Sequence, residues 1–186
     1  MITLHEIESP FMNSGEEVMG FFTRKLSCED AAKKLVDHLF LKIKSLPKDL
    51  SPAVFTECKI LVIMSVRLAT QHSGSVTRDK RELVLSLFEK LLDRRANIDS
   101  ISSLLEHRGK QYSELFNEHK REIKSGKWNN FSQTLAFTFD QFCLGGGEDG
   151  QDLLMDLSSL RKHGALSSTL FGNTFTTTVK ELAKLK

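Results

Sequence analysis

The sequence contains few of the residues that bend, cross-link or anchor a chain. Among its 186 residues are three prolines, three cysteines, one tryptophan and one tyrosine. Because proline interrupts helices, its scarcity favours long helices. The cysteines are odd in number, lie far apart and form no CxxC pair, which argues against a zinc site or a disulfide framework. We therefore expect three reduced thiols and a cytoplasmic protein.

The sequence also lacks a strong charge of either sign and a long hydrophobic run. It has 26 basic and 24 acidic side chains, so it does not indicate the basic face that nucleic-acid binding requires. The most apolar stretch, residues 60–64, is far shorter than the ~20 residues of a membrane span. The N-terminus has no basic segment followed by an apolar one, so we expect no secretory signal. The length predicts a single helical domain over residues 1–186.

The stretch from residue 51 to residue 72 is the most informative part of the chain. Ser51 is a favoured N-cap, and Pro52 falls at the first helical position, where its missing N–H costs nothing. Apolar residues occupy nearly all sides of the helix that follows. A helix of this kind is normally buried by other helices on several sides. We therefore predict that residues 51–72 form the central helix of a bundle.

A period of 3.6 residues in the apolar positions predicts further helices at residues 27–46, 78–95, 98–124, 131–144 and 149–162. We expect an irregular arm at 1–26, a bundle core at 27–144, and a helical segment at 148–186 after a glycine hinge at 145–147. His163 and Gly164 are predicted to end the helix at 149–162. The threonines after them have low helix propensity and leave the state of the tail open. The prediction is an all-α, antiparallel helical bundle of six or seven helices.

Two arginines interrupt apolar stripes. Arg67 lies against the apolar side of the central helix, and Arg108 shares the stripe of the next-but-one helix with Tyr112 and His119. Because a buried guanidinium is costly unless it is paired, each arginine indicates either an internal salt bridge or an anion-binding cleft. Arg67, Arg108, Tyr112 and His119 are thus the candidate ligand-binding residues. The carboxylates expected as partners are Glu57, Glu82, Glu106 and Asp140.

The thirteen phenylalanines form a second feature. Five of them, Phe116, Phe131, Phe137, Phe139 and Phe142, lie on the fourth and fifth predicted helices, where they either fill the core or line an apolar pocket or a groove for a partner. The candidates for such a pocket or groove are Phe116, Phe131, Phe139 and Phe142.

No catalytic or metal-binding motif is present in the sequence. Glu-x-x-His, HExxH and GxSxG are all absent, and the triple glycine follows a predicted helix with no Lys-Ser/Thr pair after it. Cys58 on the central helix is typical of a small core residue rather than a nucleophile. We expect no metal, no cofactor and no catalytic residue, and an enzyme is the less favoured prediction.

Three functional hypotheses follow from these observations. The first is a non-enzymatic protein-interaction or regulatory module with an exposed apolar face. The second is a bundle that encloses an apolar or lipid-like ligand in its Phe-rich region. The third is an enzyme with an anion-binding cleft near Arg67 and Arg108. The surplus of apolar residues at both ends also predicts a homodimer through a terminal segment. Its residues are Val18, Phe21, Phe22, Phe171, Phe175, Val179 and Leu182.

Overall fold

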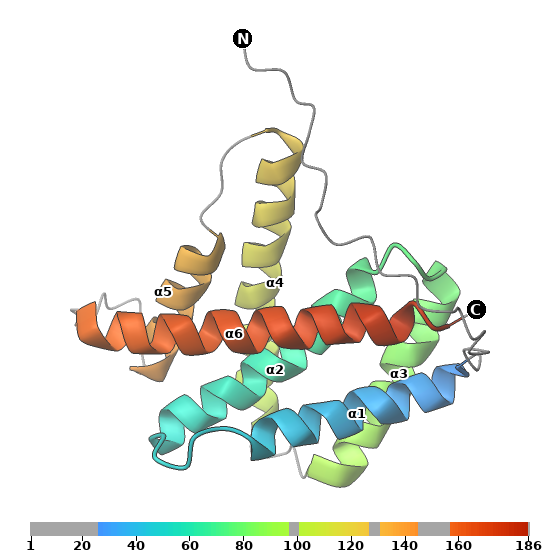
Figure 1. Ribbon diagram of the computed structural model, residues 1–186, viewed down its shortest axis with the longest axis horizontal. Coiled ribbons are helices and arrows are strands. Elements are labelled where there is room, and N and C mark those ends of the chain that lie inside the picture. Colours follow the sequence, from blue (N-terminus) through green and yellow to red (C-terminus); the bar gives the residue numbers. More distant parts are fainter. Residues whose placement is uncertain (1–25, 97–100, 127–130, 145–156, 186) are drawn as a thin grey trace, which may run out of the picture.

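The computed structural model of the protein describes residues 26–96, 101–126, 131–144 and 157–185 (Figure 1). These residues form six helices and no strand. The six helices pack against one another, so the predicted all-α bundle is confirmed. The helices are α1 (Cys28–Lys44), α2 (Pro52–His72), α3 (Arg78–Ala96), α4 (Ser102–Lys124), α5 (Phe131–Cys143) and α6 (Leu157–Leu182).

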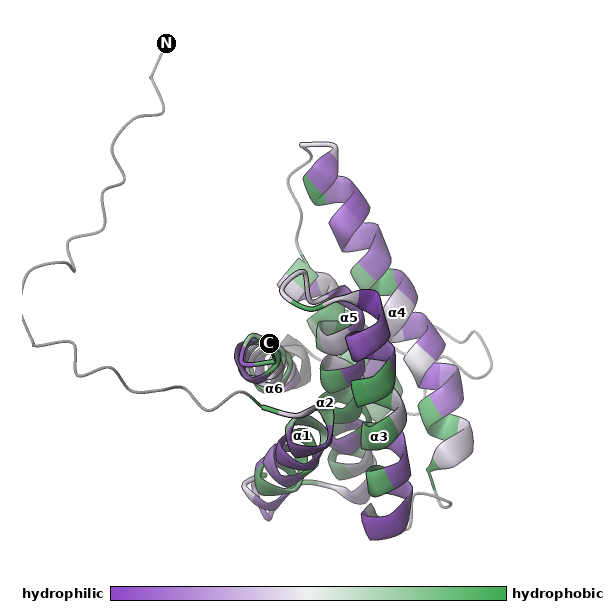
Figure 2. Ribbon diagram, turned by 90° about the vertical axis from the view of Figure 1, so that its right-hand side faces the viewer, coloured by the Kyte–Doolittle hydropathy of each residue, from purple (hydrophilic) through white to green (hydrophobic). Residues whose placement is uncertain are grey.

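Helix α2 lies at the centre of the bundle and contacts each of the other five helices. Figure 2 shows it as a largely hydrophobic helix with the other helices around it. The Ser51 hydroxyl accepts a hydrogen bond from the Val54 N–H at 3.3 Å, and Pro52 begins the helix. Its apolar side chains from Ile60 to Val66 are buried on every face. The central helix predicted at residues 51–72 is therefore confirmed.

Two pairs of helices flank α2. Helix α1 packs on α3, and its first turn is capped by Ser27, whose hydroxyl accepts from the Asp30 N–H at 3.0 Å. Helices α4 and α5 contact each other and run in opposite directions (Figure 1). The C-terminal end of α4 extends beyond its neighbours. Ile123 is 58% exposed there because no described helix covers that turn.

Helix α6 lies across α2 and also packs on α5 and α1 (Figure 1). The prediction that His163 and Gly164 end a helix is wrong, because α6 continues through both to Leu182. A Cβ at Gly164 would lie 3.0 Å from the Ala136 Cβ, so glycine here allows the close approach of α5 and α6. Thr174 and Thr178 are fully buried, and the Thr178 hydroxyl donates to the Thr174 carbonyl. The packing of α6 against α2 thus outweighs the low helix propensity of these threonines.

The C-terminal segment is part of the core. Leu170, Phe171 and Leu182 are buried. The predicted glycine hinge at 145–147 and the arm over residues 1–25 lie outside the described residues. Cys28, Cys58 and Cys143 are all unpaired thiols, as predicted. None of the described helices combines the length and hydropathy that crossing a membrane requires.

Candidate functional site

Arg108 and Tyr112, two of the predicted site residues, meet Glu57 in the interior. They lie one turn apart on α4 and reach across to α2. The Tyr112 hydroxyl donates to Glu57 Oε1 at 2.7 Å, and Arg108 Nε lies 3.8 Å from Glu57 Oε2. Glu57 and Arg108 are 3% and 4% exposed. Glu57, one of the carboxylates expected from the sequence, therefore pairs with Arg108.

Phe142 of α5 completes this group, which we call the Glu57 centre: Glu57, Arg108, Tyr112 and Phe142. The Arg108 guanidinium carbon lies 3.9 Å from the Phe142 ring centroid, which is the geometry of a cation–π contact. Tyr112 meets the same ring edge-on, with 5.5 Å between the centroids. The centre therefore joins α2, α4 and α5 through one buried charge pair and two aromatic rings.

The environment of the Glu57 centre favours neutral groups. Burial raises the pKa of Glu57 to about 7, although the Tyr112 hydrogen bond and the Arg108 charge act in the opposite direction. Burial also raises the pKa of Cys58 to about 12 and shifts the pKa of Cys143 upward, so both thiols stay protonated and unreactive at neutral pH. None of the three cavities described below is lined by the Glu57 centre. The arrangement links three helices in the interior, away from these cavities.

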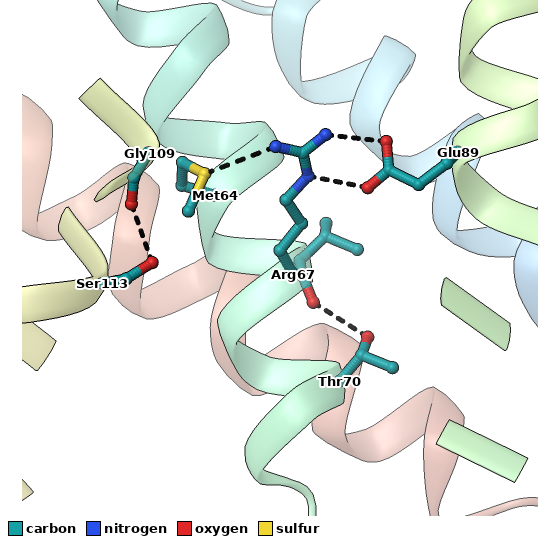
Figure 3. A network of polar contacts seen from close by, with 7 residues as sticks. Met64, Arg67, Thr70, Glu89, Gly109 and Ser113 are labelled. Atoms are coloured by element: carbon teal, nitrogen blue, oxygen red, sulfur yellow. Dashed lines mark hydrogen bonds and ion pairs between the residues drawn. The ribbon is translucent and has the colours of Figure 1, made fainter. Parts of the chain in front are cut away.

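Arg67 lies apart from Arg108, on the side of α2 that faces α3. Its Nε–H and one Nη2–H donate to the two carboxylate oxygens of Glu89, each at 2.7 Å (Figure 3). The third nitrogen, Nη1, points toward the Met64 sulfur at 3.9 Å. The Arg67 side chain is 25% exposed and that of Glu89 34%. Glu89 was not predicted as a partner because it belongs to a mixed set of charges typical of a solvated face.

This ion pair forms one wall of a cleft of about 360 Å³ between α2, α3 and α4, which we call the Arg67 cleft. Helices α3 and α4 both pack on α2 but make few contacts with each other, which leaves the space between them open. Gly109 brings α4 close to α2, since a Cβ there would lie 3.0 Å from the Met64 sulfur. Glu106 and Lys110 also line the cleft and are exposed.

His119 belongs to a third location. Its ring stacks on Phe131, with centroids 4.4 Å apart, and Phe116 lies next to both. Phe171 and Phe175 of α6 close this cluster over Phe116. A small cavity of about 150 Å³ lies beside His119 and Phe131. Of the predicted pocket residues, Phe116 and Phe131 therefore lie together with His119.

The other two predicted pocket residues lie elsewhere. Phe142 belongs to the Glu57 centre, and Phe139 is fully buried against the ring of His163, with 6.2 Å between the centroids. The four phenylalanines thus occupy three locations along α4 and α5 instead of one shared pocket. His163 in turn pairs with the buried Asp140, which ties α6 to α5.

The largest of these cavities was not predicted from the sequence. It is an open groove of about 740 Å³ between α5 and α6, which we call the α5–α6 groove. Phe137, on the side of α5 away from the core, is 49% exposed and lines it. Small residues contribute much of the remaining apolar surface. The lining residues are Ser132, Gln133, Thr134, Ala136, Phe137, Arg161, Gly164, Ala165 and Ser168. The sequence feature that could have indicated this groove is Phe137, which lies off the apolar stripe of its helix.

Comparison of the chain with protein-family models, with curated proteins and with solved structures finds no match. Within the described residues, no group of three or more His, Cys, Asp or Glu side chains could hold a metal ion.

Proposed function

We propose that the protein is a helical protein-interaction module that uses the α5–α6 groove to bind an amphipathic helix of a partner protein. The observation that carries this proposal is Phe137, a large aromatic side chain 49% exposed beside an apolar groove of about 740 Å³. Interface cores are enriched in aromatic residues. Amphipathic helices dock their apolar face into grooves of this kind, through anchors spaced one turn apart.

The small residues that line the groove suit a helix as the partner. Ala136, Gly164 and Ala165 present little or no side chain, so a partner backbone can come close to both α5 and α6. Small residues serve the same purpose wherever two helices approach closely. Gly164 and Ala136 are also the pair at which α5 and α6 approach each other closely, so the two helices meet at the base of the groove.

Charge indicates which helix would bind. Among the described residues that line the groove, Arg161 is the charged one, and exposed Lys162 follows it. A partner with an acidic side chain beside its apolar face would complement this positive edge. We therefore commit to a partner helix with Asp or Glu next to its apolar anchors.

The two alternative functions fit the cavities less well. A lipid-like ligand requires an enclosed apolar site that buries most of its surface, whereas the α5–α6 groove is open and has the exposed polar side chains of Ser132 and Gln133 along it. An enzyme requires convergent reactive groups in a cleft, whereas the pair of Arg108 and Glu57 is buried.

Selection from a displayed library of helical peptides would test this proposal. The library randomises the polar positions around a constant apolar stripe over about five turns. Peptides selected on the folded protein should be enriched in Asp and Glu beside the stripe. The variant Phe137→Ala should weaken their binding by about tenfold or more. Leu83→Ala, which truncates an exposed apolar residue of α3 at 51% exposure, is the matched control and should leave binding unchanged.

Reversal of charge is the second arm of the same experiment. Arg161→Glu should weaken the binding of the acidic peptides and strengthen the binding of basic ones. Selected peptides without a charge preference, or unchanged binding by Phe137→Ala, would contradict the proposal. If the protein instead enclosed an acyl-chain probe, and Phe137→Ala abolished that binding, the lipid-like alternative would be favoured.

The predicted homodimer is a separate proposal with less support. Phe171 and Leu182, two of the residues expected at its interface, are buried within their own chain. Val18, Phe21 and Phe22 lie outside the described residues. A self-association through the N-terminal arm thus stays a prediction from the sequence, as does the cytoplasmic compartment.

A further inference from the structure

The Arg67 cleft is a second cavity, with chemistry unlike that of the α5–α6 groove. Two cations, Arg67 and Lys110, and two carboxylates, Glu89 and Glu106, line it. These four charges sum to zero, so a simple anion would meet as much repulsion as attraction. A ligand that carries one charge of each sign would be attracted by both sets.

Arg67 still has donors to offer a ligand. A guanidinium carries five N–H donors, of which Nε–H and one Nη2–H are used by Glu89. Nη1 points away from Glu89 toward the Met64 sulfur (Figure 3), and sulfur is a weak acceptor. A carboxylate of a ligand would be a stronger acceptor for Nη1 than this sulfur. The ion pair with Glu89 holds the guanidinium in place, so binding need not order it.

Helix α4 supplies the other charges from adjacent turns. Glu106 and Lys110 are four residues apart, so they lie on the same face of α4, and both are exposed. Between them Gly109 has no side chain, which lets this turn of α4 pack directly on Met64 of α2. Leu105 and Met64 add apolar surface to the cleft.

We propose that the Arg67 cleft binds a small zwitterion, specifically a free α-amino acid with an apolar side chain. Its carboxylate accepts from Arg67 Nη1 and Lys110, its ammonium group donates to Glu106, and its side chain contacts Met64 and Leu105. The volume of about 360 Å³ is at the lower end of the range for ligand sites, which suits a ligand of this size. This inference is independent of the function proposed for the α5–α6 groove.

Isothermal titration calorimetry on the full chain with L-leucine and L-methionine would test the proposal. Two analogues serve as chemical controls. N-acetyl-L-leucine keeps the carboxylate but lacks the ammonium group, and L-leucinamide keeps the ammonium group but lacks the carboxylate. Saturable binding of either amino acid is expected, with both analogues at least about tenfold weaker. If N-acetyl-L-leucine bound as well as leucine, the site would recognise an anion alone, and the proposal would be overturned.

Variants of α4 test whether the amino acid binds in the Arg67 cleft. Lys110→Gln and Glu106→Gln change exposed side chains and should preserve the fold while weakening leucine binding by about tenfold each. Glu114→Gln changes an exposed carboxylate of the same helix outside the cleft and should have no effect. The absence of saturable binding by leucine and methionine, or binding that neither cleft variant weakens, would overturn the proposal.

Discussion

Glu57 makes the stability of the packed interior depend on the pH of the solution. It is a carboxylate on the most buried helix, and its two polar partners come from a single turn of α4. A buried pair of this kind adds little net stability over apolar residues, but removal of one partner leaves an uncompensated group. The Glu57 centre therefore contributes mainly to the specific arrangement of α2, α4 and α5.

The raised pKa of Glu57 leads to a prediction about pH. Its pKa is 4.5 as a free group and about 7 in the folded protein. Between these values the folded state holds a proton that the unfolded state has released, so this group lowers stability as the pH rises through the interval. The contribution levels off above pH 7 and amounts to about 3 kcal/mol at most.

The difference in unfolding free energy between the wild type and Glu57→Gln, measured by urea denaturation at several pH values, isolates this contribution. The stability of the wild type relative to the variant should fall from about pH 4.5 to about pH 7. Glu118→Gln, at an exposed carboxylate of α4, should give a flat difference over the same range. A wild type that gains stability relative to Glu57→Gln as the pH rises would show that Arg108 keeps Glu57 ionised.

At the scale of elements, local signals predicted the helices well where caps are strong and failed where packing decides. Ser51 and Pro52 predicted the start of α2. Gly126, with φ of 72°, follows α4, and this left-handed backbone suits glycine. The break expected at Gly164 does not exist, because its role is contact with Ala136 rather than termination. That role depends on α5, a helix distant in sequence, and no local pattern contains it.

Two glycines give opposite predictions for the same substitution. Gly172 lies inside α6, and a Cβ at this position would have no atom within 4 Å, so Gly172→Ala should stabilise the protein by about 0.5–1 kcal/mol through helix propensity. Gly126 has a left-handed backbone, so Gly126→Ala should destabilise by about 1–2 kcal/mol. Thermal unfolding of both variants checks the pair. A lower melting temperature for Gly172→Ala would mean that α6 is not helical at this position.

At the scale of the whole molecule, the sequence could predict which residues are unusual but not which of them meet. Arg67, Arg108, Tyr112 and His119 were identified as one candidate set, and the structure places them in three locations. Glu57 was among the expected partners of the arginines, whereas Glu89 was not. Which carboxylate each arginine meets depends on how α2 crosses α3 and α4, and these crossings arise from the packing of the complete bundle. The α5–α6 groove likewise exists only once α6 is in place.

The position of α6 predicts the result of truncation. A chain ending at Leu144 would lose the helix that covers α2 and α5, and would expose Phe139, whose ring meets His163 of α6, to water. We expect this chain to lose cooperative thermal unfolding and to bind a hydrophobic dye, as loosely packed states do. Cooperative unfolding of the truncated chain at the temperature of the full chain would instead make residues 27–144 a self-sufficient core.

The proposed role of the α5–α6 groove is tested most directly by a titration of the ¹⁵N-labelled full chain with a selected acidic helical peptide, followed by NMR. The account predicts that saturable shifts of backbone amides concentrate at Ala136, Phe137, Gly164 and Ala165, and that Phe137→Ala removes them. Shifts that concentrate on α1 and α3 and leave these four amides unchanged would contradict it.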